Sequence, residues 1–229
     1  MKLGLGLNIK TSGGEWTPAK LSSLLHWYKF DTGITKDGED DVTAWNDQKG
    51  SNNLTADGTT ANSPLYSSGS VLFNSNNDIL TLGTPLDLGK FSFYVRMEVS
   101  AFDGDFIFEE TVSEFIKIQD ANNIRMKIAG GSRHDVSSGV SLSADTKFNV
   151  GFEREDTADT TDDQIFVFLN NVSKTVGGAG GGTQAITDLL EITTIGKPAS
   201  DCKFYEIIIC NDTLSSSDRT SLNTYLNKI

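Results

Sequence analysis

The stretch Phe91-Ser-Phe-Tyr-Val-Arg-Met-Glu-Val99 decides the fold class of this chain. Apolar side chains alternate with mostly polar ones along it, and a period of two predicts a β-strand with one buried face. The same alternation recurs at residues 124–128 and 148–152. The chain is therefore expected to build its core from β-sheets.

Further short apolar segments lie on both sides of this stretch, separated by turn signals. They are residues 71–73, 79–82, 106–108, 115–118, 165–169, 190–195 and 204–210. The continuous apolar segment 165–169 predicts a strand that is covered on both faces. Turns are marked by Asp103-Gly104, Asn122-Asn123, Gly130-Gly131 and Asn170-Asn171. Many short strands at regular spacing, without helical periods between them, are typical of an all-β sandwich or jelly roll.

One segment near the end of the sequence has a helical pattern instead. Ser215-Ser-Ser-Asp218 resembles a capping box, with Asp in the position that Glu usually takes. Apolar residues then follow at i, i+3, i+4 and i+7, namely Leu222, Tyr225, Leu226 and Ile229. This stripe predicts a short amphipathic helix that packs on the sandwich.

Length and charge limit the classes of protein that fit. The 229 residues carry 31 acidic and 19 basic side chains, for a formal net charge of −12. A single all-β domain of this size is ordinary, so residues 20–229 are expected to form one jelly roll. The acidic balance argues against nucleic-acid binding, which needs clustered Lys and Arg. No apolar run approaches the ~20 residues of a membrane-spanning helix, and no membrane partner is expected.

Two cysteines, Cys202 and Cys210, lie at the ends of a segment that is expected to be one strand. At about 3.3 Å per residue, their Cα atoms would lie more than ~20 Å apart, beyond the reach of a disulfide. Two free thiols favour assembly in a reducing compartment. The first residues also lack the apolar region of a signal peptide. The sequence thus predicts assembly in the cytoplasm.

Residues 1–19 are expected to form an extended N-terminal arm. Residues 1–30 carry a net charge of +3, which leaves −15 for the rest of the chain. Alternation with Gly and Lys places four apolar side chains on one face of the arm: Leu3, Leu5, Leu7 and Ile9. Such a face suits a strand that is added to the sheet edge of a partner. The alternative is an incidental basic end with no docking role.

The sequence offers few groups for catalysis. His26 lies in a predicted strand and His134 in a predicted loop, and neither has a partner at metal-ligand spacing. Glu153 and Glu155 have the spacing of paired glycosidase carboxylates, but a solvated strand end is the favoured interpretation. Nucleophile-elbow, zinc-helix and paired-cysteine motifs do not occur. We therefore predict a protein that is not an enzyme and has no catalytic or metal-binding residues.

An acidic loop at residues 156–163 is the one candidate for a metal. Its Asp residues are hard oxygen ligands of the kind that calcium prefers. The loop lacks the spacing and the glycine of an EF-hand, and acidic hairpin tips are usually just solvated. We therefore expect no cofactor, with calcium at this loop as the alternative.

Several motifs follow one another in a recognisable order. They are Trp45-Asn46-Asp47-Gln48 before an Asn-rich turn, Val71-Leu-Phe73 leading to Asp78-Ile-Leu-Thr-Leu82, a strand ending at Asn170-Asn171, and residues 204–209 before the short helix. This order resembles the laminin-G-like, concanavalin A-like jelly-roll family over nearly the whole chain after residue 20. The resemblance implies a two-sheet β-sandwich.

The opening Met1-Lys-Leu-Gly-Leu-Gly-Leu7, followed by Trp16-Thr-Pro18 and the jelly roll, is similar to structural proteins of tailed bacteriophages. This similarity implies a non-enzymatic virion protein, a capsid decoration or head-surface subunit. Its partners would be other virion proteins, capsid or tail subunits, contacted through the arm. Its location would be the virion, after assembly in the host cytoplasm.

A glycan-binding adhesin module, as in a tail fibre or receptor-binding protein, is the alternative function. Its candidate sugar-binding residues are Trp45, Asn46 and Asp47. A buried tryptophan followed by a turn explains these three residues equally well.

Overall fold

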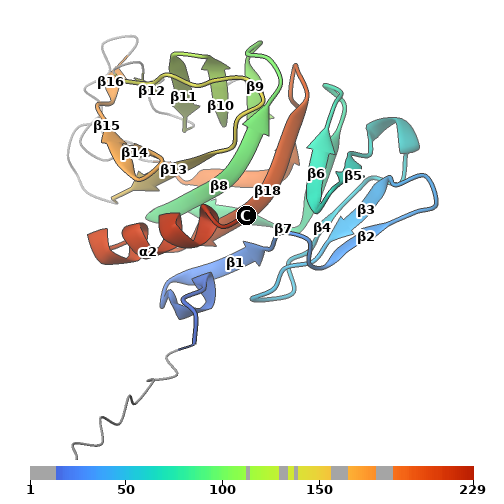
Figure 1. Ribbon diagram of the computed structural model, residues 1–229, viewed down its shortest axis with the longest axis horizontal. Coiled ribbons are helices and arrows are strands. Elements are labelled where there is room, and N and C mark those ends of the chain that lie inside the picture. Colours follow the sequence, from blue (N-terminus) through green and yellow to red (C-terminus); the bar gives the residue numbers. More distant parts are fainter. Residues whose placement is uncertain (1–13, 112–113, 129–133, 137–138, 156–164, 179–187) are drawn as a thin grey trace, which may run out of the picture.

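The computed structural model describes residues 14–111, 114–128, 134–136, 139–155, 165–178 and 188–229. They form a β-sandwich with a helix near the end of the sequence (Figure 1). The strands of the first half are β1 (Leu24–Tyr28), β2 (Ile34–Lys36), β3 (Val42–Trp45), β4 (Leu54–Thr55), β5 (Leu65–Ser67), β6 (Ser70–Phe73), β7 (Ile79–Leu88), β8 (Phe91–Val99) and β9 (Asp105–Thr111). Those of the second half are β10 (Glu114–Asp120), β11 (Asn123–Lys127), β12 (His134–Val136), β13 (Phe148–Arg154), β14 (Ile165–Leu169), β15 (Val172–Lys174), β16 (Gly177–Gly178), β17 (Leu190–Gly196) and β18 (Cys202–Cys210).

Two short 3-10 helices and one α-helix complete the described elements: η1 (Pro18–Lys20), η2 (Thr60–Asn62) and α2 (Ser216–Leu226). In the described part of the chain, none of the helices has the length and apolar character needed to cross a membrane.

The sandwich has two layers of antiparallel strands. One layer is an eight-stranded sheet in the order β15-β14-β13-β8-β18-β6-β5, with β1 also paired to β18. The other layer consists of two five-stranded sheets, β17-β7-β4-β3-β2 and β16-β12-β11-β10-β9, and β9 lies against β17. The predicted all-β sandwich is confirmed.

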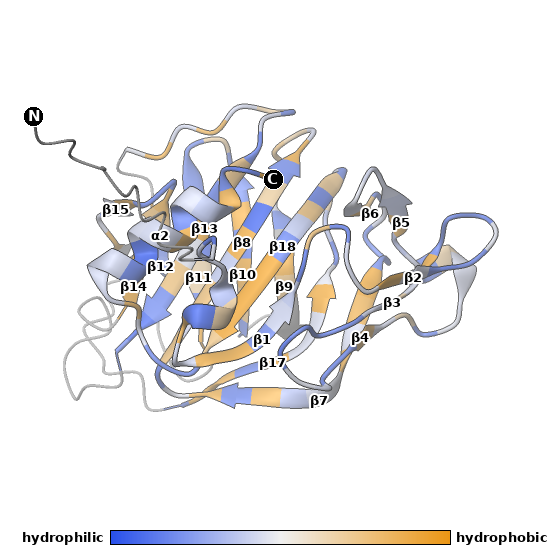
Figure 2. Ribbon diagram, turned by 60° about the horizontal axis from the view of Figure 1, so that its bottom comes forward, coloured by the Kyte–Doolittle hydropathy of each residue, from blue (hydrophilic) through white to orange (hydrophobic). Residues whose placement is uncertain are grey.

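Alternation along β8, a central strand of the large sheet, decides which side chains face each side of the sheet. Phe93 and Val95 face the core between the layers, whereas Tyr94 and Arg96 face the other side. Figure 2 shows the resulting stripes of apolar and polar residues along β8 and β18. On the outer side, the Tyr94 ring lies over Gly151, where a Cβ atom would come within 2.1 Å of the ring.

Helix α2 covers this outer side of the large sheet. Its N-cap is Ser215, whose side chain accepts a hydrogen bond from the Asp218 N–H at 3.1 Å. Leu222 and Leu226 are fully buried in a second hydrophobic cluster, separate from the core between the layers. The predicted cap and apolar stripe are confirmed.

The described residues before β1 also pack beneath this helix. The ring centroids of Trp16 and Tyr225 lie 6.2 Å apart, Pro18 is buried, and Glu15 pairs with Lys228. The packed body thus includes Trp16 and Pro18. The docking residues predicted at Leu3, Leu5, Leu7 and Ile9 lie outside the described residues, and so does the acidic loop at 156–163.

Three local expectations need correction. His134 lies in strand β12 and is 1% exposed, so the predicted loop position is wrong. Strand β14 is covered on both faces only in part, because Phe166 is 38% exposed. Strand β7 continues beyond Leu82 to Leu88. The expected absence of a Cys202–Cys210 disulfide agrees with two buried free thiols at opposite ends of β18.

Candidate functional site

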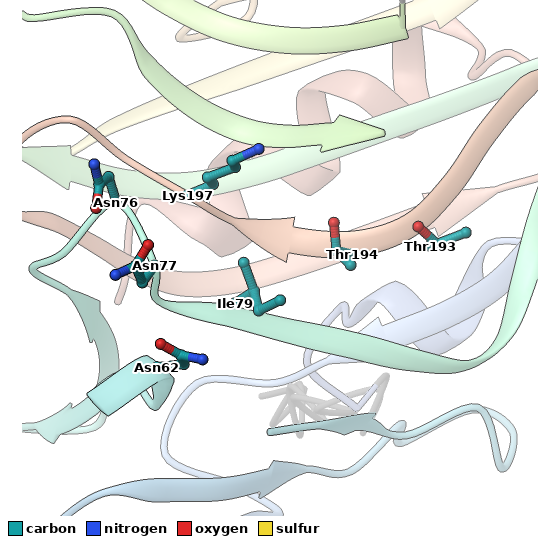
Figure 3. A pocket seen from close by; sticks show the side chains of 7 residues that line it. All are labelled: Asn62, Asn76, Asn77, Ile79, Thr193, Thr194 and Lys197. Carbon is teal, nitrogen blue, oxygen red and sulfur yellow. The ribbon is translucent and has the colours of Figure 1, made fainter. Parts of the chain in front are cut away.

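A polar hollow of about 360 Å³ lies at the β7–β17 edge of the second layer. Figure 3 shows the side chains that line it, which come from three separate segments: Asn62, Asn76, Asn77, Ile79, Thr193, Thr194 and Lys197. We call it the amide hollow, because three of these side chains are asparagines.

Strand pairing places the floor of the amide hollow. Ile79 pairs with Gly196 and Thr81 with Thr194 on the neighbouring antiparallel strands. A register shift just before Thr194 interrupts the alternation along β17. Thr193 and Thr194 are consequently both half-buried, and both line the hollow.

Asp78 fixes the loop that carries two of the asparagines. Its carboxylate accepts hydrogen bonds from the Asn74 N–H at 2.8 Å and the Ser75 N–H at 3.1 Å. Burial raises the pKa of Asp78 despite these bonds. The fixed turn leaves Asn76 and Asn77 exposed at its tip.

Two further contacts hold the segments that carry Lys197 and Asn62. The backbone of Lys197 has a φ of 71°, and its N–H donates to the Asp78 carbonyl oxygen at 2.8 Å. On the opposite side, Asn62 ends η2, and its Nδ2 donates to the Asp57 carboxylate at 2.9 Å. Both walls of the hollow are thus anchored outside it.

The chemistry of the amide hollow suits a ligand rich in hydroxyl groups. Amides and threonine hydroxyls both donate and accept hydrogen bonds, as sugar hydroxyls do. Lys197 adds a cation, and Ile79 adds an apolar surface. A concave site with a few convergent polar groups is the usual form of a small-molecule site.

The sugar-binding residues expected from the sequence do not meet in this hollow. Trp45 is fully buried, and its Nε1 donates to the Lys29 carbonyl oxygen at 3.1 Å. Asp47 is 7% exposed and accepts the N–H groups of Trp27 and Lys49. Both side chains therefore serve the core and the following turn. Asn46 is half-buried, and its N–H donates to the Gly33 carbonyl oxygen.

The carboxylates considered for glycoside hydrolysis lie elsewhere, beneath helix α2. Glu153 is 1% exposed, accepts the Tyr94 hydroxyl at 2.6 Å and pairs with Arg219 at 3.0 Å. Burial raises its pKa. The interpretation of Glu153 as a solvated strand end is wrong, because α2 covers this face. Glu155, by contrast, is partly exposed and pairs with Lys90.

Glu153 and Glu155 line a second hollow, of about 340 Å³, between β14 and the start of α2. Phe166 and Arg219 also contribute to it. Its charged groups already pair within the protein, Glu153 with Arg219 and Glu155 with Lys90. The amide hollow is the better candidate, since it presents neutral polar groups on an exposed loop.

Comparisons with known proteins give structural neighbours and no sequence match. No protein-family model matches the chain, and neither does any curated protein. Trypanosoma rangeli sialidase is similar in structure, with a TM-score of 0.60 and 12% identity over 90% of this chain and 33% of the sialidase. The chain thus spans about a third of that enzyme.

Two further neighbours were solved with sugars bound. The ligand-binding domain of botulinum neurotoxin serotype D, in complex with N-acetylneuraminic acid, has a TM-score of 0.58 and 10% identity over 90% of this chain and 51% of that one. Domain 4 of AbnA, a GH43 extracellular arabinanase from Geobacillus stearothermophilus in complex with arabinotriose, has a TM-score of 0.57 and 13% identity over 88% of this chain and 98% of that domain.

These likenesses define the class of fold. At such low identity they show the fold alone, and the fold is a concanavalin A-like β-sandwich. The β-sandwich fold that we expected from the resemblance to the laminin-G-like, concanavalin A-like family is confirmed. The similarity to bacteriophage structural proteins is not tested by these neighbours.

Proposed function

We propose that this chain is a glycan-binding module and that the amide hollow is its sugar site. The observation that carries the proposal is the convergence of three asparagines and two threonines on one concave surface. The neighbours support the class of ligand, because a domain of this fold was solved with arabinotriose, and a neurotoxin ligand-binding domain of which this chain matches 51% was solved with N-acetylneuraminic acid.

The position of the amide hollow leaves it accessible to a sugar when the chain is attached to a larger assembly through its N-terminal arm. The hollow lies on the second layer, whereas residues 14–20 pack beneath α2 on the outer side of the large sheet. A chain held through its N-terminal arm would therefore keep the hollow free for a ligand.

A glycan array followed by titration calorimetry tests this proposal. We expect Asn77→Ala and Thr194→Val each to weaken binding of the selected sugar about 5- to 10-fold, since each removes about one hydrogen bond. Asn74→Ala is the matched control, because Asn74 is an exposed amide on the same loop outside the lining. An array without any bound glycan, or binding unchanged in both variants, would refute the proposal.

A second proposed function is that of a virion structural protein, a capsid decoration or head-surface subunit assembled in the host cytoplasm and without enzymatic activity. One support is the sequence of the arm. A second is the packing of Trp16 against Tyr225 of α2, which fixes this residue of the arm to the folded body. Mass spectrometry of purified phage particles should then detect the chain in stoichiometric amounts. Particles that lack it would exclude this function.

A further inference from the structure

Three basic side chains gather on the outer side of the large sheet, near the C-terminal end of α2. Arg96 lies on β8, Lys203 on β18, and Lys147 immediately before β13. Strand β8 lies between β13 and β18 in the sheet. Figures 1 and 2 both place the C-terminus, just after α2, beside β8 and β18. We call these three residues, together with Glu98 and Tyr205, the cationic cluster.

Arg96 holds a buried charge that no carboxylate compensates. The residue is 8% exposed, and Nη1 donates to the Oδ1 atoms of Asn149 and Asn227 at 3.1 and 3.4 Å. In the described part of the chain, neither Nε nor Nη2 has a hydrogen-bond partner, and of the two only Nε is fully buried. Neutral amides do not balance a charge, and a buried charge without a counterion is unfavourable. Nη2 is therefore the atom through which Arg96 can meet an anion.

Two negative groups beside Arg96 leave its charge largely uncompensated. Glu206 is its neighbour in register on β18, but the Glu206 carboxylate accepts Nε1–H of Trp27 and the N–H of Phe30. The C-terminal end of α2, with Asn227 as its C-cap, contributes only about half a negative charge. Burial accordingly lowers the pKa of Arg96.

Lys147 adds a second cation without an ion pair among the described residues. Its Nζ lies 4.1 Å from the centroid of the Tyr205 ring. Glu98, the carboxylate of the cluster, instead accepts Nζ of Lys203 at 2.7 Å and the Tyr205 hydroxyl at 3.1 Å. Burial, together with repulsion from Arg96 and Lys203, lowers the pKa of Lys147. The cationic cluster thus has an excess of positive charge in a chain whose net charge is −12.

We propose that Arg96 and Lys147 bind a tetrahedral dianion, phosphate or sulfate, at the cationic cluster. A dianion balances both uncompensated cations, whereas a carboxylate would balance one of them. Arginine and lysine donate charge-assisted hydrogen bonds to such oxygens, and these are among the strongest in proteins. Nη2 of Arg96 and Nζ of Lys147 supply the donors. The site lies on the outer side of the large sheet, so it is independent of the amide hollow on the second layer.

Calorimetric titration of the full chain with sodium phosphate tests the site, at constant ionic strength and at a pH of about 8, where phosphate is mainly a dianion. We expect a dissociation constant of about 1 mM, a similar value for sulfate, and binding of acetate that is at least about 10-fold weaker. Lys147→Met should weaken phosphate binding about 10-fold, because it removes one charge-assisted hydrogen bond. Arg96→Gln should abolish binding. Since Lys147 makes no hydrogen bond among the described residues, its variant tests the site even if Arg96→Gln fails to fold.

An NMR titration of the Lys147 side chain gives a second measurement. An anion that binds the charged lysine favours its protonated form. Phosphate should therefore raise the pKa of Lys147 toward the ordinary value of 10.5. A pKa that stays constant as phosphate is added would contradict contact between the anion and this residue.

Lys49→Met is the matched control, since Lys49 is exposed and the change removes the same charge from a turn outside the cationic cluster. It should bind phosphate as the parent chain does. Equal weakening in Lys49→Met and Lys147→Met would show general charge screening and overturn the proposal. Acetate that binds as tightly as phosphate, or no binding up to about 50 mM phosphate, would overturn it as well.

Discussion

Asp47 shows how a single buried carboxylate organises a turn of this sandwich. Its oxygens accept the N–H groups of Trp27 and Lys49 and contact Nδ1 of His26 at 2.8 Å. Burial alone would raise the pKa of Asp47, but the hydrogen bonds, including one from the Gly50 N–H, outweigh it and lower the pKa to about 2. The folded state therefore stabilises the ionised form.

This lowered pKa predicts a loss of stability in acid. The folded pKa lies below the ordinary value of 3.8, so the contribution of Asp47 is complete above that value and is lost as the pH falls through about 2. Urea unfolding between pH 2 and 7 should show that Asp47→Asn lowers stability at neutral pH and flattens the acid limb. Asp87→Asn, at an exposed site on β7, should keep the parent slope. An unchanged slope in Asp47→Asn would contradict this.

Helix α2 is held on the sheet by polar contacts as well as by its apolar stripe. Nδ2 of Asn149 donates to Oδ1 of Asn223 at 2.8 Å and to Oδ1 of Asn227 at 2.9 Å. Arg219 pairs with buried Glu153, and its guanidinium lies over the Phe168 ring. Because these contacts are directional, they fix the helix in one position on the sheet.

The pair of Arg219 and Glu153 gives a prediction for the helix. Arg219→Met leaves the Glu153 carboxylate buried without its cation, and the free energy of unfolding should fall by about 3 kcal/mol. Adding Glu153→Gln should recover part of this loss, because the buried charge is then removed. Denaturant unfolding of the two variants measures the difference. If the double variant were less stable than Arg219→Met, the buried charge would not be the cause.

The sequence predicts those strands whose alternation of apolar and polar residues extends over enough positions to be recognised. Nine alternating residues made β8 predictable, whereas β4 has two residues and β2 three, too few for a pattern. Gly83 and Pro85 look like the end of β7, yet pairing with β17 resumes at Leu86 after a register shift. Proline is tolerated at such irregularities, so composition alone did not reveal the full strand.

The candidate site could not be predicted from the sequence, for a different reason. Asn62, Asn77 and Thr194 lie on segments far apart in the chain, and strand pairing brings them together. The residues expected to bind sugar, by contrast, were neighbours in sequence, and the hydrophobicity of Trp45 took it into the core. The covering of Glu153 likewise depends on where α2 docks. The signal that remained visible was the run of exposed amides at Asn76 and Asn77.

At the scale of the whole molecule, the buried apolar residues form two separate hydrophobic clusters, and each stabilises a different part of the fold. The main core fills the space between the layers, and the second cluster lies between α2, β1 and the outer side of the large sheet. The second is smaller and lies near the surface. Regions with fewer buried contacts open more readily in the native state, so α2 and the residues around Trp16 are expected to open before the sandwich does.

Hydrogen exchange of matched variants tests this order of opening. Leu222→Ala removes apolar contacts from the second cluster, and we expect faster exchange in α2 and in residues 14–20, with β8 and β18 nearly unchanged. Val95→Ala removes contacts from the main core, and it should accelerate exchange throughout the sandwich, because loss of core packing lowers global stability. Uniform acceleration in Leu222→Ala would show that the two clusters unfold as one unit. Selective acceleration would instead mean that residues 14–20 and α2 can open while the layer that carries the amide hollow stays folded.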